Sequence, residues 1–351
     1  MKNDLKKIRI TWDDIDKAES SISDTSSTEE KRTWGTISEN QFLEASKETT
    51  GGSILLKGWF YLGLAGLIGA FLAWIICEPS FDDRYKGGWS STMIIPLMTI
   101  LICISLGTIE SVVERSWKKA IKRGISSCGL GLVLGYLFAI FAGLLFIVFG
   151  VLLINLGADE SSLALNPVFW LSRGIAWALI GLAGGLIFGI ISKSKKKTSF
   201  GMLGGLIGGF IGGLLFDPIA LLTNGGEASR AIGMSILGGS TGIAIGLVEN
   251  ALKERWLYVK SGPLAGKQFV LYQDLVTIGK AQDSTIYLFK DPSILEQHAT
   301  IMKRAGRSVI NAFGPVVISG QMYQSQKEKV LCNGDILQIG RYTFTYAEKE
   351  K

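Results

Sequence analysis

Apolar and polar residues follow three different patterns along the chain. Residues 1–57 are rich in serine, threonine and charged residues and contain few large apolar side chains, a composition typical of disorder. Between residues 58 and 250, apolar runs of about 20 residues follow one another, the length with which a helix crosses about 30 Å of hydrocarbon. From residue 255 to 351 the apolar runs become short and alternate with polar residues. We therefore expect a disordered tail at 1–57, a membrane domain at 58–250 and an all-β domain at 255–351.

The apolar runs of the middle region predict six transmembrane helices. Basic residues gather in the loops at 115–123 and 193–197, whereas the other three loops are acidic or nearly neutral. Because positively charged loops stay in the cytoplasm, both termini are expected there, in a bacterial cytoplasmic membrane. The six helices are expected at about 59–77, 92–113, 125–154, 169–191, 200–216 and 230–249.

The membrane region contains an internal repeat. Residues 64–73 match residues 203–212 without a gap, and a second match joins residues 172–189 to residues 229–246. Because several matches are found in register, we interpret the region as three copies of one helical hairpin. The outer turns of the three hairpins are expected at Glu78-Pro79, Asn166-Pro167 and Asp217-Pro218.

Glycines recur at four-residue intervals in the last three predicted helices. Residues four apart share one face of a helix, so each helix offers a smooth strip that another backbone can approach closely. This spacing predicts helix packing of the glycine-zipper kind, within one chain or in a homo-oligomer. A glycine-lined pore is the alternative. The residues concerned are Gly181, Gly185, Gly189, Gly204, Gly208, Gly212, Gly238, Gly242 and Gly246.

Ionisable side chains are expected to be absent from the interior of the predicted helices. Glu110 and Glu249, which occupy equivalent positions in the repeat, fall at the ends predicted to be cytoplasmic. Ion-coupled transporters nearly always keep ionisable groups within the membrane, so their absence argues against active transport. A passive channel needs no such groups, and an oligomeric channel or pore component therefore stays as the alternative function.

Residue counts argue against an enzyme. The chain has one histidine, which leaves no partner set for a Ser-His-Asp or Cys-His arrangement. Its four cysteines are far apart, which predicts free thiols and gives no metal-ligand spacing. The net charge of +6 comes from basic residues beside the apolar runs, so we expect no nucleic-acid partner. We expect no catalytic residues, no metal and no cofactor.

Short alternating runs after residue 255 predict a β-sandwich of about 95 residues. The runs lie at 257–260, 268–271, 275–278, 284–288, 299–302, 316–318, 329–331, 335–339 and 342–346.

The same residues carry an ordered set of short motifs, ending at Phe344. They are Ser261-Gly-Pro-Leu-Ala-Gly266, Val276-Thr-Ile-Gly279-Lys280, Asp291-Pro-Ser293, His298-Ala299-x-Ile301, Val317-Ile-Ser-Gly320 and Leu331-x-Asn-Gly334-Asp335-x-Leu-x-Ile339-Gly340. In order and spacing, residues 256–347 resemble a forkhead-associated (FHA) domain. The resemblance implies an eleven-stranded sandwich and a non-catalytic adaptor that binds phosphothreonine peptides through loops at one end. We interpret His298 as a structural residue that orders a loop rather than as a functional switch.

This sequence departs from the family where the phosphate would lie. The family's phosphate-binding arginine is Lys280 here, its Ser-Arg pair before the histidine is Leu295-Glu296, and its later asparagine is Ser319. A lysine cannot form the bidentate fork of a guanidinium, and a leucine donates no hydrogen bond. The loss of two charge-assisted hydrogen bonds weakens phosphate binding by roughly 10²- to 10⁴-fold. The resemblance leaves Lys280, Ser293, Gln297 and Ser319 as loop residues expected to bind a partner.

We interpret the protein as a non-enzymatic membrane scaffold that recruits cytoplasmic protein partners, without a requirement for phosphate. In the tail, Trp12 and Trp34 are candidate anchors for a partner's pocket or for the membrane surface.

Overall fold

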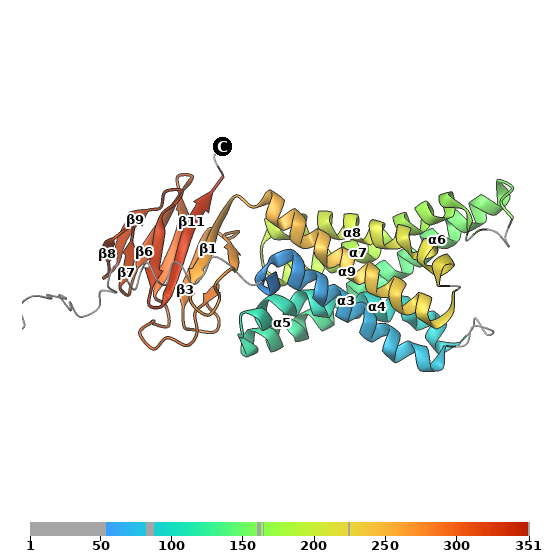
Figure 1. The fold of residues 1–351 in the computed structure, drawn as a ribbon, viewed down its shortest axis with the longest axis horizontal. Helices are drawn as coiled ribbons and strands as arrows, with labels where there is room; N and C mark the ends of the chain where they lie inside the picture. Colours follow the sequence, from blue (N-terminus) through green and yellow to red (C-terminus); the bar gives the residue numbers. More distant parts are fainter. Residues whose placement is uncertain (1–53, 82–87, 160–162, 164, 224, 350–351) are drawn as a thin grey trace, which may run out of the picture. The chain divides into compact units, whose positions relative to one another are not determined.

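The computed structural model describes residues 54–81, 88–159, 163, 165–223 and 225–349 of the chain. Over this part the chain forms a helical region followed by a β-sandwich (Figure 1). Trp12, Trp34 and nearly all of the predicted tail lie outside the described residues. The predicted fold class, long apolar helices followed by an all-β domain, is confirmed.

Six helical segments are long and apolar enough to cross a membrane, with mean hydropathies between 1.7 and 3.0. The six predicted helices are therefore confirmed as helices, and their insertion into a bilayer stays a prediction. The helices are α3 (Gly58–Cys77), α4 (Trp89–Val113), α5 (Trp117–Leu130), α6 (Tyr136–Asn155), α7 (Pro167–Ile191), α8 (Lys195–Leu222) and α9 (Gly226–Leu252). The π-helical turn η3 (Gly131–Gly135) joins α5 and α6 into one segment, and the short turns η1 (Ile54–Leu56) and η2 (Glu78–Ser80) flank α3.

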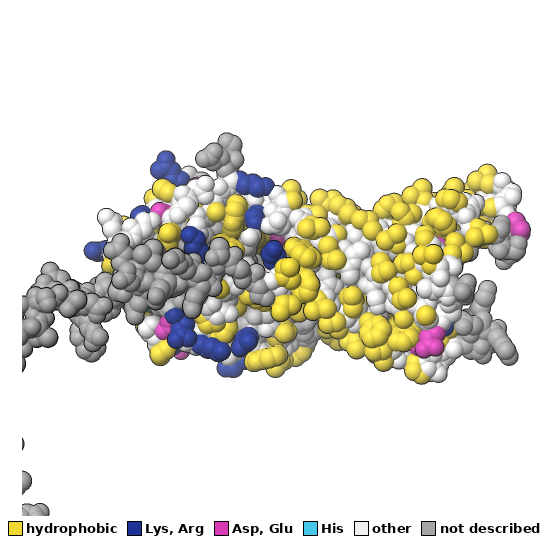
Figure 2. All heavy atoms as spheres, viewed as in Figure 1, with side chains coloured by type: hydrophobic (Ala, Val, Ile, Leu, Met, Phe, Trp, Pro, Cys, Tyr) yellow, Lys and Arg dark blue, Asp and Glu magenta, His cyan; other side chains and the backbone are white. Residues whose placement is uncertain are grey.

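The six segments pack in a closed sequence. Each helix contacts the next along the chain, and α9 returns to pack against α3. Fully buried leucine and isoleucine side chains fill the space between them, among them Leu62, Ile102, Ile180 and Leu237. The outer side chains are apolar as well: in Figure 2 hydrophobic side chains cover most of the visible face of the helices. Such apolar outer surfaces suit a lipid environment.

The third segment is longer than predicted. It was expected from residue 125 but begins at Trp117, and α5, η3 and α6 together run for 39 residues to Asn155. At 1.5 Å per residue this is about 58 Å, well beyond the hydrocarbon thickness. In α5 the side chains of Trp117, Ile121 and Ile125 recur every four residues and are 63%, 64% and 70% exposed. The segment therefore begins as an amphipathic helix, which packs alongside the end of α4.

Two expectations about charges and turns were wrong. Asp217 and Pro218 do not form a turn, because α8 continues through them to Leu222. Charged side chains also occur within the helices: Arg173 Nε of α7 lies 3.1 Å from Asp217 Oδ2, without hydrogen-bond geometry, and both side chains are largely buried. The Arg173 guanidinium is surrounded by the rings of Phe146, Phe169, Trp177 and Phe216. These rings and the carboxylate offset its removal from water.

Asn166-Pro167 does mark a helix start. The Asn166 side chain accepts a hydrogen bond from the Val168 N–H at 2.9 Å, and Pro167 occupies the first helical position, where its missing N–H costs nothing. Arg230 in α9 hydrogen-bonds Glu78, as Arg173 pairs with Asp217. The descent of these paired positions from one repeated hairpin stays a prediction.

The C-terminal region consists of two packed sheets. Their strand orders are β2-β1-β11-β10-β7-β8 and β4-β3-β5-β6-β9. All described neighbours pair antiparallel except β3 and β4, which pair in parallel. The strands are β1 (Arg255–Ser261), β2 (Gln268–Val270), β3 (Leu275–Gly279), β4 (Ile286–Tyr287), β5 (Ala299–Arg304), β6 (Arg307–Ala312), β7 (Val316–Ile318), β8 (Gln321–Tyr323), β9 (Lys327–Val330), β10 (Ile336–Ile339) and β11 (Tyr342–Glu348).

Large side chains fill the space between the two sheets. Tyr342, Phe344 and Tyr346 alternate along β11 and are fully buried, so one face of this strand forms the middle of the core. Two strands, β6 and β8, were missed from the sequence. Arg307 and Ser308 begin β6 with polar residues, and β8 has only three residues, so neither shows a clear alternating run.

Candidate functional site

The predicted partner-binding residues lie in loops at the ends of strands. The β3–β4 loop lies against the β4–β5 loop, because the Lys280 N–H donates to the Leu295 carbonyl at 3.0 Å and the Ala281 N–H donates to the Glu296 carbonyl at 3.2 Å. Lys280 and Gln297 therefore lie on neighbouring loops. All four predicted side chains are exposed: Lys280, Ser293, Gln297 and Ser319.

Ser293 and Ser319 each hydrogen-bond within their own part of the sandwich. The Ser293 hydroxyl donates to Asp291 Oδ1 at 2.6 Å, and Asp291 Oδ2 accepts from the Arg341 N–H at 2.7 Å. Burial raises the pKa of Asp291, but the hydrogen bonds from Ser293 and Arg341 outweigh burial and hold this pKa below its usual value. The Ser319 hydroxyl donates to Asp335 Oδ1 at 2.9 Å. Within the described residues no hydrogen bond joins either serine to the β3–β4 loop.

His298 connects two loops from inside the sandwich. Its side chain is buried, its Nδ1 accepts from the Leu295 N–H at 3.2 Å, and its Nε2 lies 3.0 Å from the Pro315 carbonyl oxygen. Because a carbonyl only accepts, Nε2 carries the proton and donates. Gly314 leaves room for the ring, since a Cβ there would lie less than 3 Å from it. His298 therefore orders the loops, as predicted, rather than facing a ligand.

The exposed end of the two loops is partly apolar. Leu295 is 46% exposed where the FHA resemblance predicts a hydroxyl for phosphate, and the neighbouring Lys280 supplies a single ammonium. The two loops approach closely because residue 279 is glycine: a Cβ there would lie less than 3 Å from the Glu296 carbonyl. This arrangement places one positive charge beside an exposed leucine. It lacks a guanidinium, which would donate two parallel hydrogen bonds to a phosphate.

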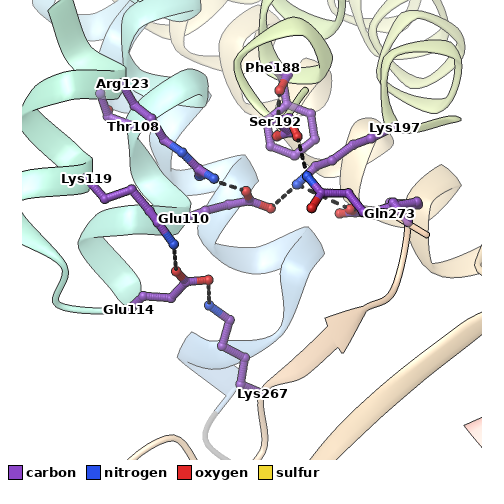
Figure 3. A network of polar contacts seen from close by, with 12 residues as sticks. Thr108, Glu110, Glu114, Lys119, Arg123, Phe188, Ser192, Lys197, Lys267 and Gln273 are labelled. Carbon is purple, nitrogen blue, oxygen red and sulfur yellow. Dashed lines mark hydrogen bonds and ion pairs between the residues drawn. The ribbon is translucent and has the colours of Figure 1, made fainter. Parts of the chain in front are cut away.

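A buried charge network joins the helices to the sandwich (Figure 3). Lys267, in the β1–β2 connection, donates to Glu114 Oε1 at the end of α4 at 2.8 Å. Lys119 of α5 lies 3.7 Å from the other oxygen of Glu114. The Lys267 side chain is only 3% exposed and that of Glu114 only 9%. Because both charges have left water, each depends on the other for compensation.

A second group of charges lies beside the first. Lys197 of α8 hydrogen-bonds Glu110 of α4, which also accepts from Arg123 at 3.2 Å. Lys197 lies 3.7 Å from Glu249 of α9, and the hydroxyl of Tyr272 in the sandwich donates to Glu249 at 2.8 Å. Burial and the negative charge of Glu249 raise the pKa of Tyr272 well above its usual value, so its hydroxyl remains a donor.

The β3–β4 loop takes part in the same junction. The Ser116 hydroxyl donates to the Gln282 carbonyl at 3.1 Å, and Lys119 donates to the Ser284 carbonyl at 2.7 Å. These contacts leave Lys280 exposed in the loop. A cavity of about 1480 Å³ lies between the helix ends and the sandwich, and Lys280 lines it.

All nine predicted glycines lie against a neighbouring helix. A Cβ on Gly181, Gly185 or Gly189 of α7 would lie less than 3 Å from the backbone of α8. The same holds for the glycines Gly204, Gly208 and Gly212 of α8 against α9, and for Gly238, Gly242 and Gly246 of α9 against α3. The Ser240 hydroxyl donates to the Gly208 carbonyl at 2.8 Å across one of these contacts. That these glycines direct helix assembly stays a prediction.

Sequence reasoning missed most of the charge network. One signal was present: Glu110 and Glu249 are equivalent in the proposed repeat, and both approach Lys197. Glu114 and Lys267 gave no such signal, because their contact joins residues 153 positions apart, one at the end of α4 and one in the sandwich. Among the described residues no three His, Cys, Asp or Glu side chains gather as a metal site, and all four cysteines are free thiols.

Comparisons with known proteins support the FHA resemblance that the motifs of residues 256–347 indicate. No family model matches the chain. It is 30% identical over 95 residues to an oxoglutarate dehydrogenase inhibitor of Corynebacterium jeikeium, which covers 27% of this chain and 65% of that protein. It is 31% identical over 90 residues to the glycogen accumulation regulator GarA of Mycolicibacterium smegmatis, covering 26% and 56%. The chain thus spans less than two thirds of either relative.

Solved structures similar to this chain include FHA domains. One is the FHA domain of the CT664 protein from Chlamydia trachomatis, with 22% identity, coverage of 28% of this chain and 100% of that one, and a TM-score of 0.25. Another is the FhaA FHA domain in complex with the intracellular domain of Rv3910, with 19% identity, coverage of 26% and 98%, and a TM-score of 0.23. From its ordered motifs, its eleven strands and its relatives, the C-terminal β-sandwich of this chain is an FHA domain.

Proposed function

We propose that this protein is a non-enzymatic adaptor of the bacterial cytoplasmic membrane, whose FHA domain recruits a cytoplasmic protein without a requirement for phosphate. FHA domains are protein-binding modules, and this one follows six helices long and apolar enough to span a membrane. The observation that carries the proposal is Leu295, which is 46% exposed beside Lys280 at the loop end of the sandwich.

The chemistry of this end favours a partner that offers an apolar side chain. An exposed leucine between two ordered loops gains from burial, about 25 cal/mol for each Å² of apolar surface removed from water. Lys280 adds a charge that a partner's carboxylate can meet. Phosphate, in contrast, would find one ammonium and Glu296, a like charge, on the neighbouring loop. Lys280, Ser293, Gln297 and Ser319 are the proposed contact residues.

The proposed orientation places both termini in the cytoplasm. The basic loops at 115–123 and 193–197 belong to the helix ends that contact the FHA domain: Lys119 donates to the Ser284 carbonyl, and Lys197 Nζ lies 5.8 Å from the ring centroid of Tyr272. Cationic loops favour the cytoplasmic side. Cys332, exposed in the β9–β10 connection, makes the orientation testable. A membrane-impermeant thiol reagent should label it only after the membrane is permeabilised, and labelling of intact cells would contradict the orientation.

Partner binding is tested with full-length protein purified from native membranes. We expect Leu295→Glu to lose the partners that the unaltered chain retains, Lys280→Gln to weaken their binding, and phosphatase treatment to leave them bound. The matched control is Val330→Glu, because Val330 is 41% exposed on β9, outside the loops proposed to bind. Loss of partners on phosphatase treatment, with Leu295→Glu neutral, would show that the domain reads phosphate.

The channel alternative has no specific observation in its favour. Its pore was to be lined by the glycine strips, and each of the nine glycines lies against a neighbouring helix. Their proposed role is close packing of the helices within one chain.

A further inference from the structure

The cavity between the helix ends and the FHA domain carries an excess of positive charge. Ten lysine and arginine side chains line it, against five aspartate and glutamate side chains. The acids that belong to the network, such as Glu110 and Glu114, are already paired with cations of the same wall. In the described part of the chain, the remaining cations have neither an ion pair nor a side-chain hydrogen bond. They are Lys57, Lys118, Lys122, Lys193 and Lys280, all exposed.

These lysines converge on one space from separate segments. Lys118 and Lys122 lie on α5, Lys193 lies in the α7–α8 connection and Lys280 lies in the FHA domain. Like charges around one cavity repel each other unless an anion lies among them. The cavity, at about 1480 Å³, is larger than typical ligand sites of about 300–1,000 Å³ and leaves ample room for a phosphate-bearing group.

The lysines of α5 also adjoin an apolar surface. Trp117, Ile121 and Ile125 form an exposed stripe on this helix, and Lys118 and Lys122 follow Trp117 and Ile121 directly in the sequence. A helix with one apolar face and adjacent lysines lies at the membrane surface, with its cations at the level of the lipid headgroups. A soluble phosphate would gain nothing from such a stripe, whereas the acyl chains of a lipid would.

We propose that the cavity binds the phosphate-bearing headgroup of an anionic phospholipid. Lys118, Lys122, Lys193 and Lys280 surround the phosphate, and the acyl chains lie along the apolar stripe of α5. Since the lysines come from both the helices and the FHA domain, the bound lipid holds the two regions together. Lys280 belongs both to this cavity and to the loop end proposed above to bind a partner, whereas Lys118, Lys122 and Lys193 belong to the cavity alone.

The test measures binding of short-chain phosphatidylglycerol to the full-length protein, purified in detergent, by native mass spectrometry. Phosphatidylcholine of the same chain length and soluble glycerol 3-phosphate are the two comparison ligands. We expect phosphatidylglycerol to bind best and the Lys118→Gln/Lys122→Gln variant to bind it about tenfold or more weakly, at about 1 kcal/mol for each basic residue near a membrane surface. Ile121→Ser/Ile125→Ser should weaken lipid binding as well, but not binding of glycerol 3-phosphate.

The matched control is Lys303→Gln/Arg307→Gln, which removes the same charge from exposed positions on β5 and β6, outside the cavity. It should bind the lipid as the unaltered chain does, and all variants should melt alike without lipid. Equal binding of phosphatidylcholine, or unchanged binding by Lys118→Gln/Lys122→Gln, would overturn the proposal. Equally tight binding of glycerol 3-phosphate would identify a soluble anion as the ligand instead. Lipid binding that requires prior phosphatase treatment would identify a phosphorylated segment of this chain as the occupant.

Discussion

The helical region and the FHA domain build their interiors in opposite ways. In the helices, backbones meet at glycines: a Cβ added to Gly205 of α8 would lie less than 3 Å from the carbonyl of Gly181 of α7. In the sandwich, large side chains meet between the sheets, and Tyr342, Phe344 and Tyr346 are fully buried. The glycine contacts between the helices therefore leave no room for an added methyl group. The core of the FHA domain, in contrast, depends on its large side chains to fill the space between the sheets.

The surroundings proposed for the two regions, water for the FHA domain and lipid for the helices, account for this difference. In water, burial of large apolar side chains is the main source of stability, so the FHA domain places its largest side chains inside. In lipid, outer and inner apolar side chains are solvated alike, and helices associate through close van der Waals contact at small residues. The large apolar side chains exposed on α6, such as Phe141 and Leu144, suit a lipid surrounding. Each region should therefore be destabilised by a different kind of substitution.

Removal of a large side chain from the sandwich should have the largest effect. Phe344→Ala should lower the free energy of unfolding of the FHA domain by about 3–5 kcal/mol, through lost burial and the cavity that remains. Hydrogen exchange of β10 and β11 in the full-length protein measures it. Leu275→Ala is the control, since Leu275 is 51% exposed on β3. Equal effects of the two variants would contradict a core centred on β11.

The junction between the regions should be the next most sensitive place. Lys267→Met should destabilise the full chain by about 1.5–3 kcal/mol, because Glu114 would lose a hydrogen bond to a charged donor while buried. Thermal unfolding in detergent micelles measures the change. Glu114→Gln/Lys267→Met should recover part of the loss, since no buried carboxylate then lacks a partner.

The matched control for this junction is an exposed pair of the same kind. Lys196 contacts Glu254 at 2.6 Å, with side chains 49% and 54% exposed, and exposed pairs contribute about 0–1 kcal/mol. Lys196→Met should therefore change stability much less than Lys267→Met. If both lysines behave alike, burial is not what makes the Glu114 contact important.

Addition of a methyl group should distinguish the two interiors most directly. Gly205→Ala should destabilise the helical region by about 1–3 kcal/mol, because the new Cβ forces α7 and α8 apart. Gly143→Ala is the control: no atom lies within 4 Å of a Cβ built there, and alanine favours helix more than glycine does. Unfolding of both variants in micelles measures the difference. A loss of stability with Gly143→Ala as large as with Gly205→Ala would show that the close contact is unimportant.

Local patterns predicted most elements, and long-range contacts decided the rest. Apolar runs located the six helices, and the motifs around Gly279 and His298 located the FHA domain, because each pattern consists of residues close together in the sequence. Asp217 was expected in a turn, since a proline follows it, yet α8 continues through both residues, and Asp217 Oδ2 lies 3.1 Å from Arg173 Nε of α7. The contact of Lys267 with Glu114 joins residues 153 positions apart, and no periodicity reports such a contact.

The smallest expected effect concerns the pH dependence of a loop in the FHA domain. Asp291 accepts hydrogen bonds from Ser293 and from the Arg341 N–H, and these bonds lower its pKa in the folded state despite partial burial. A carboxyl whose pKa is lower in the folded than in the unfolded state stabilises the fold above its unfolded pKa of about 3.9. This stabilisation is lost as the pH falls through the lower, folded pKa.

Asp291→Asn should therefore cost less than about 1.5 kcal/mol at neutral pH and nothing at a pH below the folded pKa. Unfolding of the full chain, followed by hydrogen exchange in β11 at several pH values, measures this convergence. Asp274→Asn is the control, because the Asp274 side chain is exposed and makes no hydrogen bond within the described residues. If the Asp291→Asn and unaltered chains differ equally at all pH values, the carboxylate charge does not hold the loop. The stability of the FHA domain would then come from its buried aromatic core and not from this carboxylate. The FHA domain would in that case differ from the junction with the helices, where buried charges such as Glu114 and Lys267 make the contacts.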